Sequence, residues 1–354
     1  MSFQPITSAA PAGARDRFRA VHDQYLARIL ALVEEVVGGD SPRGSALVTM
    51  CRYHFETGGK RLRALLPLAV AEALGADAEA LVAFGAACEM LHNATLVHDD
   101  VQDGDAMRRG RPTVWRRFGV PQAINLGDAM FYYAVLLVGR VDAPAAAREA
   151  AARRLMCETL RVIDGQEREF ALKQSPRPTL GEYFAMVEGK TSGLFAVPMA
   201  GAAALCGAPP ALVAALEESA RHMGVLFQLQ DDVLDLYGDK GREARGSDVG
   251  EGKRSALVVH ALDAATLPQA TWLRGVLDKE REQTTPADVE QVTELFEETG
   301  SLRFALEEIV RRRAAALAPA ALAEHPRLRA LVAEMCDLFL EPIRPLLAAD
   351  GTVN

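Results

Sequence analysis

Residues 91–103 read LHNATLVHDDVQD, and residues 227–239 read FQLQDDVLDLYGD. In both stretches an apolar run leads into the motif DDxxD, in which two adjacent aspartates are followed by a third. Apolar residues that recur at spacings of three and four predict an amphipathic helix with one buried face. Residues four apart share a face of a helix, so the first and third aspartates of each motif point the same way. The two stretches therefore predict two partly buried helices, each with a pair of carboxylates on one face.

The same helical periodicity continues through the rest of the chain. Segments of about 15–35 residues, on the long side for helices, are separated by breaks rich in Gly and Pro, such as those at 38–42, 209–210 and 238–241. The sequence contains no strand–turn–helix pattern with a glycine-rich phosphate loop. We therefore predict an all-α fold, a single-domain helical bundle over residues 17–354, preceded by a flexible lead over residues 1–16.

Composition restricts the classes of function. Of 354 residues, 49% are hydrophobic and 25% are charged, which is ordinary for a folded globular protein and excludes a mainly disordered chain. The formal net charge of −9 argues against nucleic acid as a partner. The five cysteines form no CxxC motif, and the first residues form no signal-peptide pattern. We therefore expect a reduced protein in the cytoplasm.

One stretch is apolar enough to raise the question of membrane insertion. Residues 194–216 carry no charge, and their number would suffice to span a bilayer. The stretch is rich in alanine and is interrupted by Pro198, Pro209 and Pro210. We predict two buried core helices joined by a Gly-Ala-Pro-Pro turn, and no transmembrane segment.

The six aspartates of the two motifs are candidate metal ligands. Like charges four apart destabilise a helix by about 0.2–0.5 kcal/mol per pair, so crowded carboxylates on a buried helix call for a compensating cation. Oxygen ligands without His or Cys at metal-binding spacing suit Mg²⁺ better than Zn²⁺. A solvated acidic helix face accounts equally well for one such motif, but poorly for two. The candidate ligands are Asp99, Asp100, Asp103, Asp231, Asp232 and Asp235.

Basic segments occur near both acidic motifs. They are GGKRLR (58–63), RRGR (108–111), GKTSG (189–193) and GK (252–253). The planar fork of arginine matches phosphate oxygens, and His92 lies two helical turns before the first motif on nearly the same face. Each segment alone is typical of a solvated surface, but their occurrence beside two acidic motifs favours a site for a diphosphate.

Together these segments resemble the trans-isoprenyl diphosphate synthases, or polyprenyl synthetases, and are most similar to geranylgeranyl diphosphate synthases. The resemblance implies an all-α bundle around a central cavity, and a homodimer. The blocks that carry it, in order, are GGKRLR (58–63), LHNATLVHDDVQD (91–103), RRGRPT (108–113), NLGDAMF (125–131), GKTSGLF (189–195), FQLQDDVLDLYGD (227–239) and GSDVGEGK (246–253).

The resemblance also implies the reaction. Isopentenyl diphosphate would be joined head-to-tail (1′–4) to an allylic diphosphate, namely dimethylallyl, geranyl or farnesyl diphosphate, after Mg²⁺-assisted ionisation of the allylic carbon–oxygen bond. Three Mg²⁺ ions per active site are implied, for which Mn²⁺ can substitute. Two of them would be bound by Asp99 and Asp103, and the third by Asp231 with Asp235 nearby.

The resemblance further assigns roles to basic and polar residues. The residues implied for the allylic diphosphate are Arg108, Lys190 and Lys253. Those implied for isopentenyl diphosphate are Lys60, Arg63, His92 and Arg109. The implied catalytic side chains are Lys190, Thr191 and Gln228, of which the last two would stabilise positive charge on the substrate through their oxygens.

Two positions depart from the family pattern. Ala64 follows GGKRLR, where a proline is common. Residues 240–245 (KGREAR) form a shorter loop than usual and lack the second lysine that usually precedes the GSD block. Arg242 or Arg245 would have to replace that lysine, although arginine and lysine are not equivalent phosphate ligands.

In this family, residues four and five positions before the first DDxxD limit the hydrocarbon pocket. Here they are Thr95 and Ala94, whereas short-chain enzymes tend to carry an aromatic residue. The resemblance thus favours a C20 product, geranylgeranyl diphosphate, and leaves C25 to C40 products open. The aromatic residues at 131–133 could close the pocket instead, or could belong to the core.

Other functions remain open. A non-catalytic subunit of a heteromeric synthase would be expected to lack motif residues, and all six aspartates are present. A terpene cyclase would carry an Asn/Ser/Glu triad in place of the second DDxxD and would not need GGKRLR. The doublet His98–Asp99 also occurs in metal-dependent phosphohydrolases, which would supply further histidine ligands.

Overall fold

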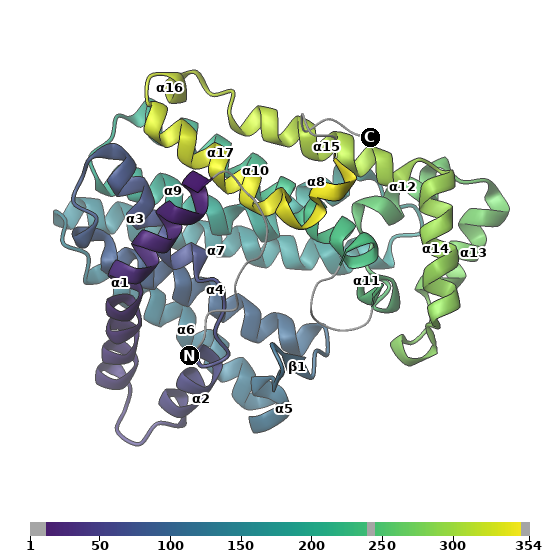
Figure 1. The fold of residues 1–354 in the computed structure, drawn as a ribbon. Helices are drawn as coiled ribbons and strands as arrows, with labels where there is room; N and C mark the ends of the chain where they lie inside the picture. The colour runs from purple at the N-terminus through teal and green to yellow at the C-terminus, as the bar shows by residue number, and fades with distance from the viewer. Residues whose placement is uncertain (1–11, 239–244, 348–354) are drawn as a thin grey trace.

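The structure, a computed structural model, describes residues 12–238 and 245–347. The described residues are almost entirely helical (Figure 1), so the all-α prediction is confirmed. A hairpin of two short antiparallel strands, β1 (Met107–Arg108) and β2 (Arg111–Pro112), follows the first acidic motif. Helix begins already at Ala12, so residues 12–16 of the expected flexible lead are helical, and the rest of that lead lies outside the described residues.

The helices of the N-terminal half are α1 (Ala12–Asp40), α2 (Ala46–Phe55), α3 (Leu62–Leu74), α4 (Val82–Gln102), α5 (Val114–Phe118), α6 (Val120–Gly139), α7 (Ala145–Gln174), α8 (Leu180–Val187) and α9 (Gly193–Leu205). Those that follow are α10 (Pro210–Tyr237), α11 (Ser247–Gly250), α12 (Ala256–Ala264), α13 (Leu267–Leu277), α14 (Pro286–Glu298), α15 (Ser301–Ala316), α16 (Ala320–Ala323) and α17 (Pro326–Leu340). Short helical turns are η1 (Glu79–Leu81), η2 (Glu188–Ser192), η3 (Arg281–Gln283) and η4 (Glu341–Leu346).

Two long helices, α4 and α10, form the centre of the bundle. Helix α4 packs against α3, α6 and α9, and α10 packs against α9, α15 and α17 (Figure 1). Their apolar faces are fully buried, with Phe84 and Met90 on α4 and Leu226 and Leu229 on α10. Each such side chain contributes about 1.5–3 kcal/mol through burial, so the positions of these two helices are set by the core.

Both acidic motifs lie at the carboxyl-terminal ends of these central helices, since α4 ends at Gln102 and α10 ends at Tyr237. The carboxyl end of a helix is the negative end of its dipole, and a carboxylate there is unfavourable by about 0.3–1 kcal/mol. Helix stability alone would not place six aspartates at these two ends. The arrangement therefore indicates a site that requires negative charge.

The apolar stretch at 194–216 belongs to the core. It forms most of α9, a turn and the start of α10, and α9 is buried along almost its whole length. The predicted pair of core helices is confirmed. Among the described residues, the segment Glu79–Gln102 is long and apolar enough to cross a membrane, but 83% of its apolar window is buried inside the protein.

Candidate active site

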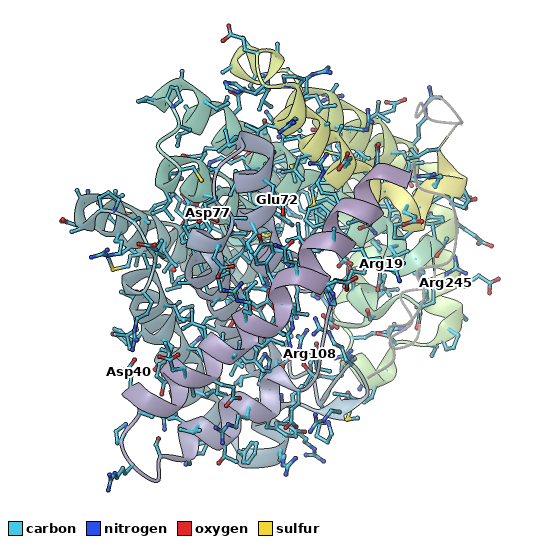
Figure 2. The ribbon with its side chains drawn as sticks, turned by 60° about the vertical axis from the view of Figure 1, so that its left-hand side comes forward. Arg19, Asp40, Glu72, Asp77, Arg108 and Arg245 are labelled. Atoms are coloured by element: carbon cyan, nitrogen blue, oxygen red, sulfur yellow. The ribbon has the colours of Figure 1, made fainter. Side chains whose placement is uncertain are left out.

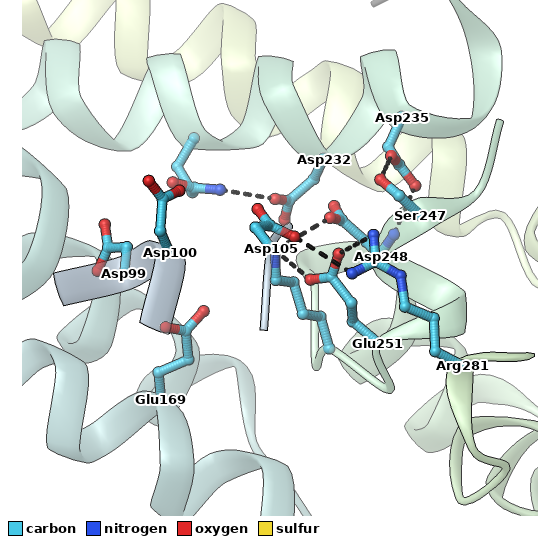
Figure 3. Close-up of polar contacts among 12 residues, drawn as sticks. Asp99, Asp100, Asp105, Glu169, Asp232, Asp235, Ser247, Asp248, Glu251 and Arg281 are labelled. Atoms are coloured by element: carbon cyan, nitrogen blue, oxygen red, sulfur yellow. Dashed lines mark hydrogen bonds and ion pairs between the residues drawn. The ribbon is translucent and has the colours of Figure 1, made fainter. Parts of the chain in front are cut away.

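The ends of α4 and α10 face each other across a cavity of about 450 Å³. In Figure 3, Asp99 and Glu169 lie on one side of the site, and Asp232 and Asp248 lie on the other. The tertiary structure thus brings both motifs to one site. The carboxylates that line the cavity are Asp99, Asp103, Asp105, Glu169, Asp231, Asp232, Asp248, Glu251 and Glu280.

Asp99 and Asp103 share the cavity-facing side of α4, as their spacing predicts. Burial raises the pKa of both carboxyls. Lys190 Nζ lies 4.0 Å from Asp99 Oδ1 and donates a hydrogen bond to Glu169 on α7. Burial lowers the pKa of Lys190, but the charges of Asp99 and Glu169 outweigh burial and leave that pKa raised. Lys190 is therefore a cation held among carboxylates at the edge of the cavity.

Asp100 lies behind Arg108 and does not line the cavity, whereas Arg108 does. Arg108 Nε donates to Asp100 Oδ1 at 2.7 Å, and the other oxygen of Asp100 has no partner among the described residues. Burial raises the pKa of Asp100 to about 6, although Arg108 opposes the shift. In this arrangement Asp100 orients Arg108 toward the cavity.

Asp232 anchors a chain of hydrogen bonds that ends at Thr191. Its carboxylate accepts from the hydroxyl of Tyr183 at 2.7 Å and from the amide of Gln228 at 3.0 Å. Gln228 Oε1 accepts from Thr191 Oγ1 at 3.2 Å. Burial raises the pKa of Asp232 to about 7. The structure thus brings Thr191 and Gln228 together on the cavity surface.

Asp235, the last residue of the second motif, is buried and does not line the cavity. Its two oxygens accept hydrogen bonds from the Ser247 hydroxyl at 2.7 Å and from the backbone N–H of Asp248 at 3.1 Å. These bonds hold the start of α11 against α10 (Figure 3). The carboxylate of Asp248 lines the cavity in its place.

Oxygen donors on two facing helix ends fit Mg²⁺, which takes one or two carboxylates together with substrate phosphates. Within residues 12–238 and 245–347, no three His, Cys, Asp or Glu side chains are grouped as a complete metal site. The motif carboxylates on the cavity surface, which could hold such an ion together with substrate phosphates, are those of Asp99, Asp103, Asp231 and Asp232.

Lys190 and Thr191 lie on a π-helical turn, η2, between α8 and α9. Such turns are rare and occur frequently at functional sites. Thr191 is buried and lines the cavity next to Lys190. One irregular turn therefore presents two of the implied catalytic side chains side by side.

A second group of polar residues lies between α3 and α4. Arg63 Nη1 is 3.4 Å from His92 Nε2, and the Arg63 guanidinium lies 4.8 Å from the centre of the Phe195 ring. Burial, followed by the charge of Arg63 and nearby arginines, lowers the pKa of His92 well below its usual value. Burial lowers the pKa of Arg63 to about 10. At neutral pH this pair is a cation beside a neutral imidazole, and both residues line the cavity.

Lys60 and Arg109, also implied for isopentenyl diphosphate, are exposed and do not line the cavity. Arg109 donates to the carbonyl of Gly58. Gly59 has a φ of +125°, a backbone conformation that other residues rarely adopt, so glycine is favoured at the point where Arg109 approaches the chain. The structure thus places Arg109 against the segment 58–59, beside the cavity.

Lys253 lines the cavity and forms ion pairs with Glu251 at 2.7 Å and Asp248 at 3.4 Å. Arg281 joins the same network, because its guanidinium reaches Glu251 and Asp105, each at 3.2 Å (Figure 3). Sequence reasoning identified Lys253 alone among these five residues. Asp248 and Glu251 stand in the GSDVGEGK block, whereas no sequence pattern connects Asp105 or Arg281 with them, so only the folded chain reveals this network.

Arg245 is one of the two residues that could replace the missing family lysine. Its Nε donates to the carbonyl of Leu236, and its side chain does not line the cavity. Figure 2 shows it well away from Arg108, a residue that does line the cavity. The other candidate, Arg242, lies outside the described residues.

The apolar part of the cavity surface comes from five helices, with Thr95 on α4, Val162 on α7, Met186 on α8, Leu194 on α9 and Phe227 on α10. Residues 131–133 do not line it. Tyr132 is 73% exposed, so the suggestion that these aromatic residues close the pocket finds no support.

His98 faces away from the cavity, toward α6. Its Nε2 lies 3.2 Å from the carbonyl oxygen of Ile124, and its ring packs edge-on against Phe131. The doublet His98–Asp99 therefore points in two directions, which disfavours a histidine–aspartate metal site of the phosphohydrolase kind.

Known proteins are similar to this chain in both sequence and fold. Residues 45–296 match the family model described as polyprenyl synthetase. A geranylgeranyl diphosphate synthase from Mycobacterium tuberculosis is 38% identical over 268 residues, which cover 72% of this chain and 75% of that protein. A geranylfarnesyl diphosphate synthase from Natronomonas pharaonis is 32% identical over 78% of this chain and 84% of its own.

Solved structures agree with these sequence matches. A geranylgeranyl pyrophosphate synthetase from Pyrococcus horikoshii superposes with a TM-score of 0.82 at 27% identity, over 92% of this chain and 98% of that one. A decaprenyl diphosphate synthase from Rhodobacter capsulatus superposes with a TM-score of 0.80 at 27% identity, over the same shares. The chain belongs to the polyprenyl synthetase family.

Proposed function

We propose that this protein is a trans-prenyltransferase that condenses isopentenyl diphosphate head-to-tail with an allylic diphosphate. The observation that carries the proposal is one cavity with two kinds of polar surface. Paired carboxylates with Lys190, Arg108 and Lys253 lie at the ends of α4 and α10, and Arg63 with His92 lies beside them. Two diphosphates can therefore bind next to each other, one through metal ions and one through side chains.

In the proposed mechanism Asp99, Asp103 and Asp231 would hold Mg²⁺, three ions per active site, for which Mn²⁺ could substitute. When bound, the metal neutralises the charge that develops on the leaving diphosphate. Lys190, Arg108 and Lys253 orient that diphosphate. The allylic carbon–oxygen bond then breaks, and the bonding electrons leave with the diphosphate. The double bond of isopentenyl diphosphate attacks the resulting allylic cation, and the departed diphosphate takes up the proton that the new tertiary cation loses.

The polar pair Thr191–Gln228 supplies oxygens near the developing cation, and Asp232 holds Gln228 in that orientation. The aromatic rings of Phe195 and Phe227 pack against the Arg63 guanidinium, with centroids at 4.8 and 5.9 Å. Phe227 lines the cavity, so its ring would limit the access of water to the allylic cation.

A C20 product, geranylgeranyl diphosphate, agrees best with the small side chain of Thr95 on the cavity surface and with the named relatives. Products of C25 to C40 are the alternative, and the geranylfarnesyl (C25) diphosphate synthase among the relatives supports keeping it. Incubation with isopentenyl diphosphate, Mg²⁺ and each allylic primer, followed by mass spectrometry of the dephosphorylated alcohols, decides between them. No consumption of isopentenyl diphosphate with any primer would favour a non-catalytic subunit.

The enzyme is proposed to act in the cytoplasm as a homodimer that pairs through α6 and α7. Large apolar side chains are exposed along both helices, and such a stripe is typical of an interaction surface. On α7 three of them recur at helical spacing, so they form one face. The exposed residues are Val120, Ile124, Tyr132 and Leu136 on α6 and Met156, Leu160, Ile163 and Phe170 on α7.

A further inference from the structure

A buried ion pair between Arg61 and Glu89 lies directly behind the Arg63–His92 corner of the cavity. Arg61 Nη1 donates to Glu89 Oε1 at 2.9 Å, and the two side chains are only 5% and 3% exposed. Neither residue lines the cavity. Arg61 has a φ of +51°, in the left-handed region. Residues other than glycine stay there only where their surroundings hold them.

Other hydrogen bonds extend the pair into a four-residue cluster. Arg61 Nη2 donates to the carbonyl of Phe55 at the end of α2. Asn93 Nδ2 donates to Glu89 Oε1 at 3.0 Å, and Asn93 Oδ1 lies 3.1 Å from His54 Nε2. The Glu89 cluster (His54, Arg61, Glu89 and Asn93) is buried throughout and joins α2, the start of α3 and α4.

The cluster and the neighbouring corner of the cavity share the same backbone. Arg63 follows Arg61 by two residues, and His92 follows Glu89 by three, on the same two elements. Arg63 and His92 face each other across the gap that Arg61 and Glu89 bridge. A shift of Arg61 relative to Glu89 would therefore shift Arg63 relative to His92.

The charge of Glu89 allows two explanations to be separated. Glu89 is a carboxylate beside an otherwise basic corner of the cavity. Its negative charge favours the charged form of Arg63, whereas the positive charges of Arg61, Arg108 and Arg109 disfavour the charged form of His54. If Glu89 acted only through its charge, removing that charge would strengthen the binding of an anion there. If it acts by holding Arg61, removing the charge would weaken the binding.

We propose that Glu89 is a positioning residue for the isopentenyl diphosphate site. Its ion pair with Arg61 fixes the position of residues 58–63 relative to α4. It thereby holds Arg63 and His92 at the spacing that a diphosphate requires. This inference rests on the proposed function, because it states how one of the two substrate sites is built. Glu89 itself does not touch the substrate.

The test is steady-state kinetics of Glu89→Gln, which keeps the shape of the side chain and removes its charge. The KM for isopentenyl diphosphate is expected to rise about 10- to 100-fold, as a small displacement of binding groups can produce. The KM for the allylic substrate should change by less than about twofold, because its groups are held elsewhere. The matched control is Glu308→Gln, since Glu308 is equally buried and accepts from Arg312 Nε at 2.7 Å on α15.

Three outcomes would overturn the proposal: a lower KM for isopentenyl diphosphate, an equal rise in both KM values, or a loss of thermal stability with both KM values unchanged. Arg61→Lys is the second variant, used also if Glu89→Gln does not fold. It keeps the charge but cannot reach Glu89 and the Phe55 carbonyl together, so the same selective rise in KM is expected.

Calorimetry of isopentenyl diphosphate without metal, in wild type and Glu89→Gln, separates this inference from the proposed function. If the wild type binds isopentenyl diphosphate but forms no prenyl product, the proposed function fails while the affinity difference still tests the role of Glu89. Equal affinities in the two proteins would overturn the positioning role whether or not the enzyme turns over.

Discussion

Gly165 on α7 and Lys190 on the π-helical turn η2 are in backbone contact. A Cβ on Gly165 would lie 2.2 Å from the backbone nitrogen of Lys190 and 2.7 Å from the carbonyl carbon of Gly189. Helix α7 therefore determines how far the turn, and with it the Lys190 side chain, enters the cavity. The same helix carries Glu169, to which Lys190 donates.

Gly165→Ala should displace the π-helical turn. We expect kcat to fall about 10- to 100-fold and the free energy of unfolding to fall by about 1–3 kcal/mol through overpacking. Gly275→Ala is the control, because Gly275 is helical and a Cβ there would meet no atom within 4 Å. That change should leave kcat unaltered and stabilise α13 by about 0.5–1 kcal/mol. A wild-type kcat in Gly165→Ala would contradict the role of this contact.

The aspartates should differ in their effect on metal dependence. Asp99→Asn removes a charge from the cavity surface and should lower kcat about 10²- to 10³-fold, with a higher Mg²⁺ concentration for half-maximal rate. Asp235→Asn should change that concentration much less, because Asp235 bonds to Ser247 and Asp248 away from the cavity surface. Titration of activity with Mg²⁺ measures both, and equal effects would show that Asp235 turns inward when substrate binds.

Product length should respond to Thr95 and not to the exposed aromatic residue on α6. Thr95→Phe adds a ring at the apolar cavity surface and is expected to shorten the main product by one or more five-carbon units, because volume is lost where the chain grows. Tyr132→Ala should leave the product distribution unchanged, since Tyr132 is exposed to solvent. Mass spectrometry of the alcohols gives the result, and an unchanged product from Thr95→Phe would place the end of the pocket elsewhere.

His54 should reduce stability in mild acid. Burial lowers its pKa from 6.5 to about 3. Below about pH 6.5 the unfolded chain binds a proton that the folded chain excludes, so the free energy of unfolding falls as pH falls, by up to about 1.4 kcal/mol per pH unit. His54→Gln can still donate to Asn93 and should remove this contribution. Urea unfolding at several pH values between about 4 and 6.5 measures the two slopes, and parallel slopes would refute the prediction.

The exposed apolar face of α6 and α7 should control the oligomeric state. Leu160→Glu places a charge at the centre of that face, and its burial in an interface would be strongly unfavourable. We expect a monomer by light scattering where the wild type forms a dimer. Leu267→Glu, at an even more exposed leucine on α13, should leave the dimer intact. A dimeric Leu160→Glu would locate the interface on another surface.

Much of the active site was predictable because it depends on local spacing. The i, i+4 relation places Asp99 and Asp103 on one side of α4 in any helix, and the apolar runs before both motifs show which face is buried. The break before Pro209 and Pro210 likewise predicts the boundary between α9 and α10. These features need only neighbouring residues along the chain.

Other features depend on residues that meet only after folding. Asp100 and Asp232 are each the second aspartate of a DDxxD motif, and motif spacing does not show what their carboxylates contact. In the folded protein Arg108 donates to Asp100, and Tyr183 and Gln228 donate to Asp232. No spacing in the sequence relates Glu169 to Lys190. Their contact exists because two glycines let α7 and the π-helical turn touch.

The sequence by itself determined the helical class, the family and the two acidic motifs with their diphosphate chemistry, because periodicity and motif spacing are local properties. Only the tertiary structure decided that Asp235 holds the start of α11 while Asp248 lines the cavity, and that Arg61 and Glu89 lie behind the corner occupied by Arg63 and His92. The physical reason is that the role of a charged side chain depends on the groups within hydrogen-bonding distance of it. The packing of segments that are distant in the sequence decides which groups those are.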